Sequence, residues 1–124
     1  MKLYLCGPVT GMADGNKAEF SKCQLALESL GIEVVNPTDL GMTIETPWGE
    51  AMKKCITEML TCDGVAMLPS WTGQSRGCRL EVTIATKVGI EVGYCSDWIA
   101  HLKGEPVSKA SMFFRAKGYH GAIF

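Results

Sequence analysis

Short apolar runs alternate with longer amphipathic stretches along this chain of 124 residues. Four runs have the length of buried strands: 2–6, 32–35, 65–68 and 90–94. Apolar residues at helical spacing predict helices over 17–30, 47–60, 75–89 and 97–103. Alternation of strand and helix is typical of a parallel sheet covered on both faces. We therefore expect an α/β fold of the Rossmann-like or flavodoxin-like type, a doubly wound parallel sheet in three layers.

Two glycine-containing loops are expected to meet at one crevice of this fold. In doubly wound sheets, ligands bind beyond the carboxyl ends of the strands, where the strand order reverses. With a flavodoxin-like order this point lies between the first and third strands, and the loops there are 7–16 and 69–77. The chain is expected to be a single domain with its core at 2–103, and 104–124 to be a docked surface arm.

Glu81 is the charged residue in an otherwise apolar helical stripe. The stripe is formed by Gly77, Leu80, Glu81, Ile84, Ala85 and Val88. Because helical side chains lean toward the N-terminus, Glu81 is expected to reach over Gly77, where the missing side chain leaves a gap. A buried carboxylate costs several kcal/mol unless it is compensated, so this one is a candidate for chemistry. The alternative is a glutamate rotated to the edge of the stripe and solvated.

The loop after the first strand offers weak binding signals. Gly7 permits close backbone approach to a ligand, and Thr10 offers a hydroxyl beside Gly11, although a purely structural turn fits equally well. Tyr4 precedes this loop, and its hydroxyl needs a buried partner, for which Glu81 across the crevice is the candidate.

The second loop carries Trp71 and leads to Ser75 and Arg76. Ser75 fits the N-cap of the following helix, and a helix N-terminus with serine and arginine also suits a phosphate group. Trp71 is a candidate for stacking on a base, or it covers the core.

Composition narrows the choice of function. A net charge of −1 argues against broad nucleic-acid binding, and no apolar run approaches the roughly 20 residues that span a bilayer. The apolar part of the N-terminus is too short for a signal peptide, so a cytoplasmic protein is expected. Six cysteines contain no Cys-x-x-Cys pair and no histidine at ligand spacing, which favours buried, reduced thiols over disulfides or a zinc site. No metal or cofactor is expected. The cysteines are Cys6, Cys23, Cys55, Cys62, Cys78 and Cys95.

Several short motifs together resemble the nucleoside 2-deoxyribosyltransferase-like superfamily, which includes 2′-deoxynucleoside 5′-phosphate N-hydrolases. The similarity extends over roughly residues 2–98 and is greatest to a small bacterial and phage branch. The motifs are Tyr4-x-Cys6-Gly7-Pro8, Pro37, Pro47-Trp48, Cys62-Asp63, Leu68-Pro69-x-Trp71 and Ser75-Arg76-Gly77-x-x-x-Glu81.

The resemblance implies a five-stranded sheet, a homodimer or larger assembly, and a nucleoside or its 5′-monophosphate as substrate. It also implies that Glu81 is the nucleophile and that Tyr4 holds its carboxylate. The residues expected to bind substrate are Gly7, Pro8, Thr10, Gly11, Trp71, Ser75, Arg76 and Gly77. Asp63, at the opposite end of the third strand, is expected to be structural.

Two positions bear on the activity that the resemblance implies. Serine at position 75 is similar to the nucleotide hydrolases, whereas the transferases tend to have an acid there, which would repel a 5′-phosphate. Cys55 stands where the family usually has an aspartate that helps to protonate the departing base. We therefore expect an N-glycosidase acting on a (deoxy)nucleoside 5′-monophosphate. The alternatives are a deoxyribosyltransferase and a catalytically impaired nucleotide-binding or sensor module.

Overall fold

The four strands form one parallel sheet in the order β2-β1-β3-β4. A computed structural model describes residues 1–71, 73 and 75–105. The strands are β1 (Lys2–Cys6), β2 (Glu33–Val35), β3 (Gly64–Met67) and β4 (Glu91–Tyr94). The order reverses between β1 and β3, as the flavodoxin-like prediction requires. The resemblance implied five strands, whereas the described residues form four.

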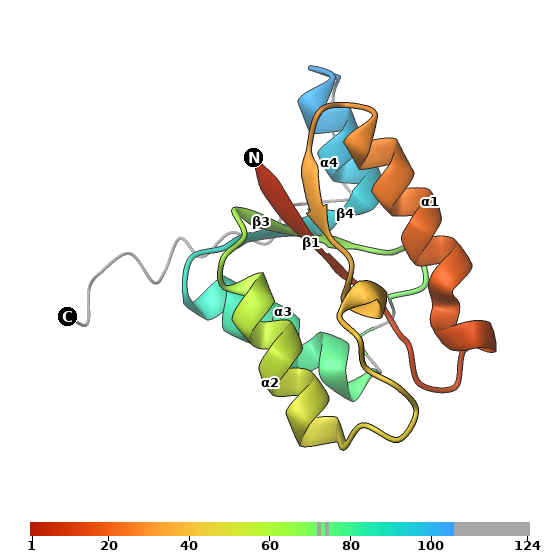
Figure 1. Ribbon diagram of the computed structural model, residues 1–124. Helices are drawn as coiled ribbons and strands as arrows, with labels where there is room; N and C mark the ends of the chain where they lie inside the picture. Colours follow the sequence, from red (N-terminus) through yellow and green to blue (C-terminus); the bar gives the residue numbers. More distant parts are fainter. Residues whose placement is uncertain (72, 74, 106–124) are drawn as a thin grey trace.

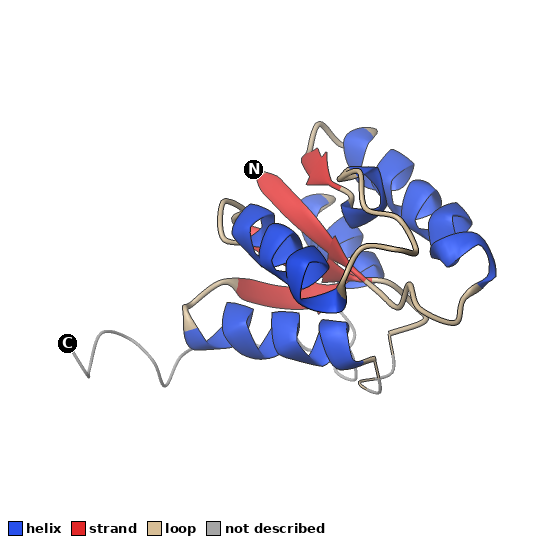
Figure 2. Cartoon of the chain, turned by 60° about the horizontal axis from the view of Figure 1, so that its bottom comes forward, coloured by secondary structure: helices blue, strands red, loops and turns tan. Residues whose placement is uncertain are grey.

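The helices cover both faces of the sheet, so the predicted three-layer fold is confirmed (Figures 1 and 2). Figure 1 shows α1 and α4 together on one side and α2 and α3 on the other. The helices are α1 (Lys17–Glu28), α2 (Trp48–Met59), α3 (Arg76–Lys87) and α4 (Cys95–Leu102). Two short 3-10 helices, η1 (Ala13–Asn16) and η2 (Pro37–Asp39), lie in the loops after β1 and β2. Within the described residues, none of the helices is long and apolar enough to cross a bilayer.

Alternating side chains of the central strand fill two separate cores. Leu3 and Leu5 are fully buried against α1 and α4, whereas Tyr4 and Cys6 point into the layer of α2 and α3. Each fully buried leucine contributes about 1.5–3 kcal/mol to folding. One face of β1 therefore packs only leucines against α1 and α4, and the other face places the Tyr4 hydroxyl and the Cys6 thiol between the sheet and α2 and α3.

The buried face of α3 differs from the predicted stripe. Leu80 and Val88 are 36% and 58% exposed, and Cys78, Glu81 and Ala85 are the buried residues. The buried side chains follow one narrow line along the helix, at positions 78, 81 and 85, which are offsets 0, 3 and 7. Cys78 is therefore buried, whereas Leu80 and Val88 lie outside this line.

α2 begins at Trp48, one residue after the predicted start at position 47. Pro47 is the N-cap residue, and the Thr46 hydroxyl accepts a hydrogen bond from the Thr43 amide at 2.9 Å instead of capping the helix.

All six cysteines are buried as predicted, but not all are free thiols. A disulfide joins Cys23 of α1 to Cys95 at the start of α4, which corrects the expectation of six reduced cysteines. The two residues are 72 positions apart in the chain, and their spacing gives no sign of pairing. The fold brings their Cα atoms to 6.6 Å, within the range that a disulfide requires.

Two remaining predictions concern the ends of the fold. Asp63 is structural as expected, because its carboxylate accepts a hydrogen bond from the Lys2 amide at 2.8 Å at the amino end of the sheet. The predicted surface arm falls largely on residues 106–124, which lie outside the described residues.

Candidate active site

Glu81 is a buried carboxylate held by two donors from the central strand. Its side chain is 6% exposed. The Tyr4 hydroxyl donates a hydrogen bond to Oε2, and the Cys6 thiol donates a longer one to Oε1, with Sγ and Oε1 3.6 Å apart. Tyr4 and Cys6 share a face of β1 because they are two positions apart in a strand. The predicted contact between Tyr4 and Glu81 is therefore confirmed.

The surroundings of Glu81 bring its ionisation close to neutral pH. Burial raises the pKa of Glu81 to about 7, against the opposing effect of the hydrogen bonds from Tyr4 and Cys6. The pKa of Tyr4 lies well above its usual value, because of burial and the neighbouring Glu81 charge, so its phenol stays a hydrogen-bond donor. A carboxyl group with these properties can act as a nucleophile or exchange a proton near pH 7.

Three free cysteines surround this carboxylate. Cys78 lies one turn before Glu81 on α3, and the Cys6 thiol is 3.9 Å from its carbonyl oxygen. The two neighbouring thiols shift each other's pKa in opposite directions: Cys78 raises the pKa of Cys6, and Cys6 lowers the pKa of Cys78. Cys55 reaches the same site from α2, next to the Tyr4 hydroxyl, and burial raises the pKa of its thiol.

Cys6 and Cys78 were not singled out as candidates from the sequence. The available signal was their spacing from predicted site residues: Cys6 follows Tyr4 by two positions in a strand, and Cys78 precedes Glu81 by three in a helix.

The expected open gap above Gly77 is filled. A Cβ atom at Gly77 would lie 3.1 Å from the Met52 sulfur, so a side chain of α2 covers this glycine. Gly7 likewise has a packing explanation, because a Cβ atom there would come within 2.5 Å of Leu68. In both cases a close neighbour within the fold accounts for the glycine.

The two loops predicted to meet at the crevice are joined by hydrogen bonds. The Asn16 side-chain amide donates to the Pro8 carbonyl at 3.1 Å and to the Ser70 hydroxyl at 3.3 Å. Ser70 in turn donates to the Glu19 carboxylate from its amide at 2.9 Å and from its hydroxyl at 2.7 Å. Sequence reasoning missed these residues. Thr10 and Gly11 lie exposed in the first loop.

The start of α3 carries the predicted anion-binding residues. Ser75 is the N-cap residue and accepts a hydrogen bond from the Cys78 amide at 3.5 Å, so its structural role is confirmed. The exposed Arg76 guanidinium lies 3.6 Å from the centre of the Trp48 ring, in cation–π contact. A surface pocket of about 350 Å³ lies here. It is lined by Trp48, Arg76, Arg79, Leu80 and Thr83.

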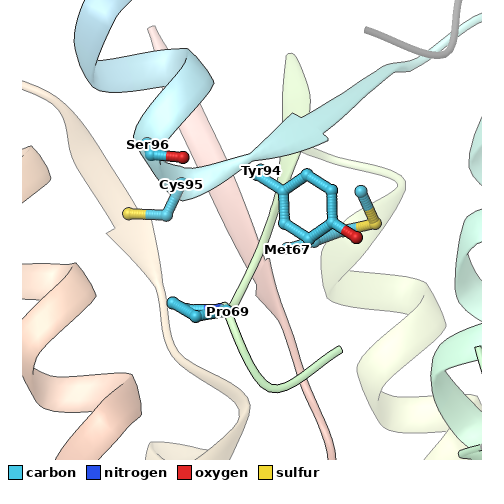
Figure 3. A pocket seen from close by; sticks show the side chains of 5 residues that line it. All are labelled: Met67, Pro69, Tyr94, Cys95 and Ser96. Carbon is cyan, nitrogen blue, oxygen red and sulfur yellow. The ribbon is translucent and has the colours of Figure 1, made fainter. Parts of the chain in front are cut away.

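A second pocket, of about 310 Å³, lies at the carboxyl ends of β3 and β4. Figure 3 shows the Tyr94 ring beside the Met67 side chain, with Ser96 at the start of α4 and Pro69 after β3. Trp71 packs edge-on against Tyr94 with ring centres 6.5 Å apart, so it covers the core. Its indole nitrogen is buried without a hydrogen-bond partner among the described residues.

The pockets differ from the predicted crevice in position. The prediction placed a crevice between β1 and β3, whereas one pocket lies beside β4 and the other beside α2 and α3. Glu81 lines neither of them, because Tyr4, Cys6 and the adjoining helices enclose it.

Comparison with known proteins gives one match. Residues 1–94 match the family described as Domain of unknown function (DUF4406), and the matched region contains β1 to β4 and all of the residues around Glu81. Neither a curated protein nor a solved structure matches the chain.

Proposed function

The chain belongs to the DUF4406 family of domains of unknown function, and we propose that it is an N-glycosidase acting on a (deoxy)nucleoside 5′-monophosphate. The observation that carries this proposal is the buried Glu81 carboxylate, which Tyr4 holds and whose pKa is about 7. Burial of a carboxylate is costly and is not needed for packing, so a carboxylate at this buried position favours a chemical role.

The geometry suggests which oxygen of Glu81 attacks the sugar. Oε2 accepts the Tyr4 hydrogen bond, whereas Oε1 has only the weak thiol donor of Cys6 at 3.6 Å. In the proposed reaction Oε1 forms a bond to C1′ of the sugar as the bond from C1′ to the base nitrogen breaks. The base leaves with that electron pair and takes a proton from solvent water, and the hydroxide left behind is neutralised by the proton lost when water attacks C1′. Water then attacks C1′, releases Glu81 as a carboxylate, and gives the free sugar phosphate.

The start of α3 is the proposed contact for the 5′-phosphate. Arg76 provides a positive charge, and the helix N-terminus adds a favourable dipole. The Trp48 ring holds the guanidinium from one side at 3.6 Å, which limits the positions that Arg76 can adopt.

Cys55 favours a second candidate, a nucleotide-binding module without glycosidase activity. Glu81 and Asp97 are the buried carboxylates of the described residues, and Asp97 accepts a hydrogen bond from the Tyr94 amide at 3.1 Å at the start of α4. The Glu81 cluster, formed by Glu81, Tyr4, Cys6, Cys55 and Cys78, therefore lacks a second carboxylate among the described residues. That second carboxylate would protonate the departing base. A transferase, which passes the sugar to another base, would need the same proton donor.

Incubation of the protein with a panel of ribo- and deoxyribonucleoside monophosphates tests the proposal. We expect release of free base from at least one monophosphate, measured by chromatography, at a rate above that of the same protein carrying Glu81→Gln. Binding without base release throughout the panel would favour the binding module. A product that appears only when a second base is added would favour the transferase.

Arg76→Ala is expected to weaken binding of a monophosphate about 10-fold while binding of the matching nucleoside is unchanged, because only the phosphate contact is lost. Isothermal titration calorimetry of both ligands measures the difference. Arg79→Ala is the matched control, since Arg79 is also exposed on α3 and lines the same pocket one turn later. Equal effects of the two substitutions on monophosphate binding would remove Arg76 from the proposed site.

Tyr4→Phe is expected to lower kcat/KM by about 10- to 100-fold, the range for loss of a hydrogen bond to a charged group. The Tyr4 hydrogen bond lowers the pKa of Glu81, so its removal should raise that pKa further. Activity that needs ionised Glu81 rises with pH through about 7 in the wild-type protein, and this rise should move to higher pH in the variant. An unchanged pH profile would contradict the role of Tyr4.

A further inference from the structure

Two thiols and one carboxylate converge within the Glu81 cluster. Sγ of Cys6, Sγ of Cys78 and a carboxylate oxygen of Glu81 all lie within 4.8 Å of one another. The three residues are 1%, 2% and 6% exposed. They come from β1 and α3, which are far apart in the sequence, so the three residues form no Cys-x-x-Cys motif that would predict a metal site. Each of these atoms is a metal ligand once its proton is removed.

One of the distances between these ligand atoms matches tetrahedral coordination, and the others lie within 4.8 Å. With metal–sulfur bonds of about 2.3 Å and metal–oxygen bonds of about 2.1 Å, ligand sulfur and oxygen atoms lie about 3.6 Å apart. Sγ of Cys6 and Oε1 of Glu81 are 3.6 Å apart. Two sulfur ligands of one ion lie about 3.8 Å apart, within the 4.8 Å that encloses the cluster.

We propose that Cys6, Cys78 and Glu81 form a binding site for a soft divalent cation of the Zn²⁺ and Cd²⁺ class. Thiolates select such ions over Mg²⁺ and Ca²⁺. Binding releases the protons of the two thiols, and Glu81 coordinates as a carboxylate through Oε1. Three protein ligands leave one position for water.

Neighbouring groups support the ligands. Tyr4 donates its hydrogen bond to Oε2 and leaves Oε1 directed at Cys6, as an outer-shell partner orients a metal ligand. Cys78 lies in the first turn of α3, where the helix dipole stabilises a thiolate.

This proposal does not depend on the glycosidase. Metal binding and nucleophilic attack both need Oε1 of Glu81, so a bound cation would block the attack. A glycosidase with this site is expected to be inhibited by Zn²⁺ and restored by a chelator, whereas a binding module would take up the ion and release no base with or without it.

Titration of the metal-free protein with CdCl2 tests the site directly, because cadmium–thiolate bonds absorb in the ultraviolet. The titration omits thiol reductants so that the Cys23–Cys95 disulfide stays closed. We expect one Cd²⁺ per chain in the wild-type protein and in Cys62→Ala. Cys62 is the matched control, since it is a free, buried thiol outside the cluster. Cys6→Ala and Cys78→Ala should each weaken Cd²⁺ binding by at least ~100-fold. Loss of an outer-shell partner weakens metal binding by up to ~100-fold, and loss of a direct ligand should cost at least as much.

Absence of the band in the wild-type protein, or its full retention in both cluster variants, would overturn the proposal. Loss of the band in Cys62→Ala alone would overturn it too, because the ion would then lie elsewhere. Circular dichroism reports whether each variant is folded. If an alanine variant does not fold, Cys78→Ser keeps the side-chain volume, and a serine variant that binds Cd²⁺ as tightly as wild type would equally refute the site.

Discussion

Replacement of Glu81 by glutamine is expected to lower base release by at least ~10⁴-fold while the fold is retained, on the order of the loss caused by removing other catalytic nucleophiles. The amide oxygen of glutamine can still accept the Tyr4 hydrogen bond, but an amide is not a competent nucleophile at C1′. Free base measured by chromatography gives the effect on the rate.

The same substitution has a stability effect whose sign is set by the pKa of Glu81. Burial raises this pKa to about 7 in the folded protein from its ordinary value of 4.5, so the protonated form is favoured by folding. This contribution to stability is complete below pH 4.5 and is lost as pH rises through 7. Glu81→Gln should therefore gain stability relative to wild type above pH 7, as seen in melting temperatures at several pH values.

Glu58→Gln is the control for this experiment. Glu58 lies on α2 and is only partly buried, so the substitution removes a carboxylate without touching the cluster. Wild-type turnover by Glu81→Gln would exclude Glu81 as the nucleophile. Negligible base release by wild type and both variants would instead favour the binding module.

Cys55→Asp is expected to increase base release by ~10² to 10⁴-fold, the contribution typical of a positioned general acid. Cys55 faces Tyr4 and Glu81 from α2 and is 7% exposed. A carboxyl group placed there would lie beside the Glu81 charge and in a buried site, and both influences raise its pKa. It would therefore hold a proton at neutral pH that it can give to the departing base.

Cys55→Asn separates acid catalysis from the change of shape. Asparagine has nearly the size of aspartate but cannot supply the proton, so we expect no gain in base release. Both variants bury a polar group and should melt at lower temperature than wild type. A folded Cys55→Asp protein with unchanged activity would contradict the role of this position. A Cys55→Asp variant that fails to fold would indicate that Cys55 packs in a closed core. That result would favour the binding module over the glycosidase.

Sequence patterns predicted the fold and the centre of the site because both depend on short periodicities. Alternation of strand and helix led to the parallel sheet, and the charge on the apolar stripe of α3 led to Glu81 and its contact with Tyr4. These features need only the orientation of side chains within one element and the order of the strands.

Contacts between elements were not predictable in the same way. Cys23 and Cys95 pair across 72 positions, and Met52 of α2 fills the space above Gly77 of α3. Leu80 and Val88 are apolar yet exposed, since the width of the buried face depends on how α3 is rotated against the sheet. Such contacts depend on how whole helices pack against the sheet and against each other. The spacing of apolar residues along one helix carries little information about this packing.

The central position of β1 determines when this cluster can assemble during synthesis. β1 precedes β2 and β3 in the chain, and it pairs with β2 on one side and with β3 on the other. The hydrogen-bond partner of Tyr4 is the carboxylate of Glu81, which lies 77 residues later in the chain. Closing so long a loop costs entropy before any contact repays it. A nascent chain that ends before α3 therefore carries the phenol without its partner, and the Tyr4–Glu81 pair can form only after α3 has been synthesised.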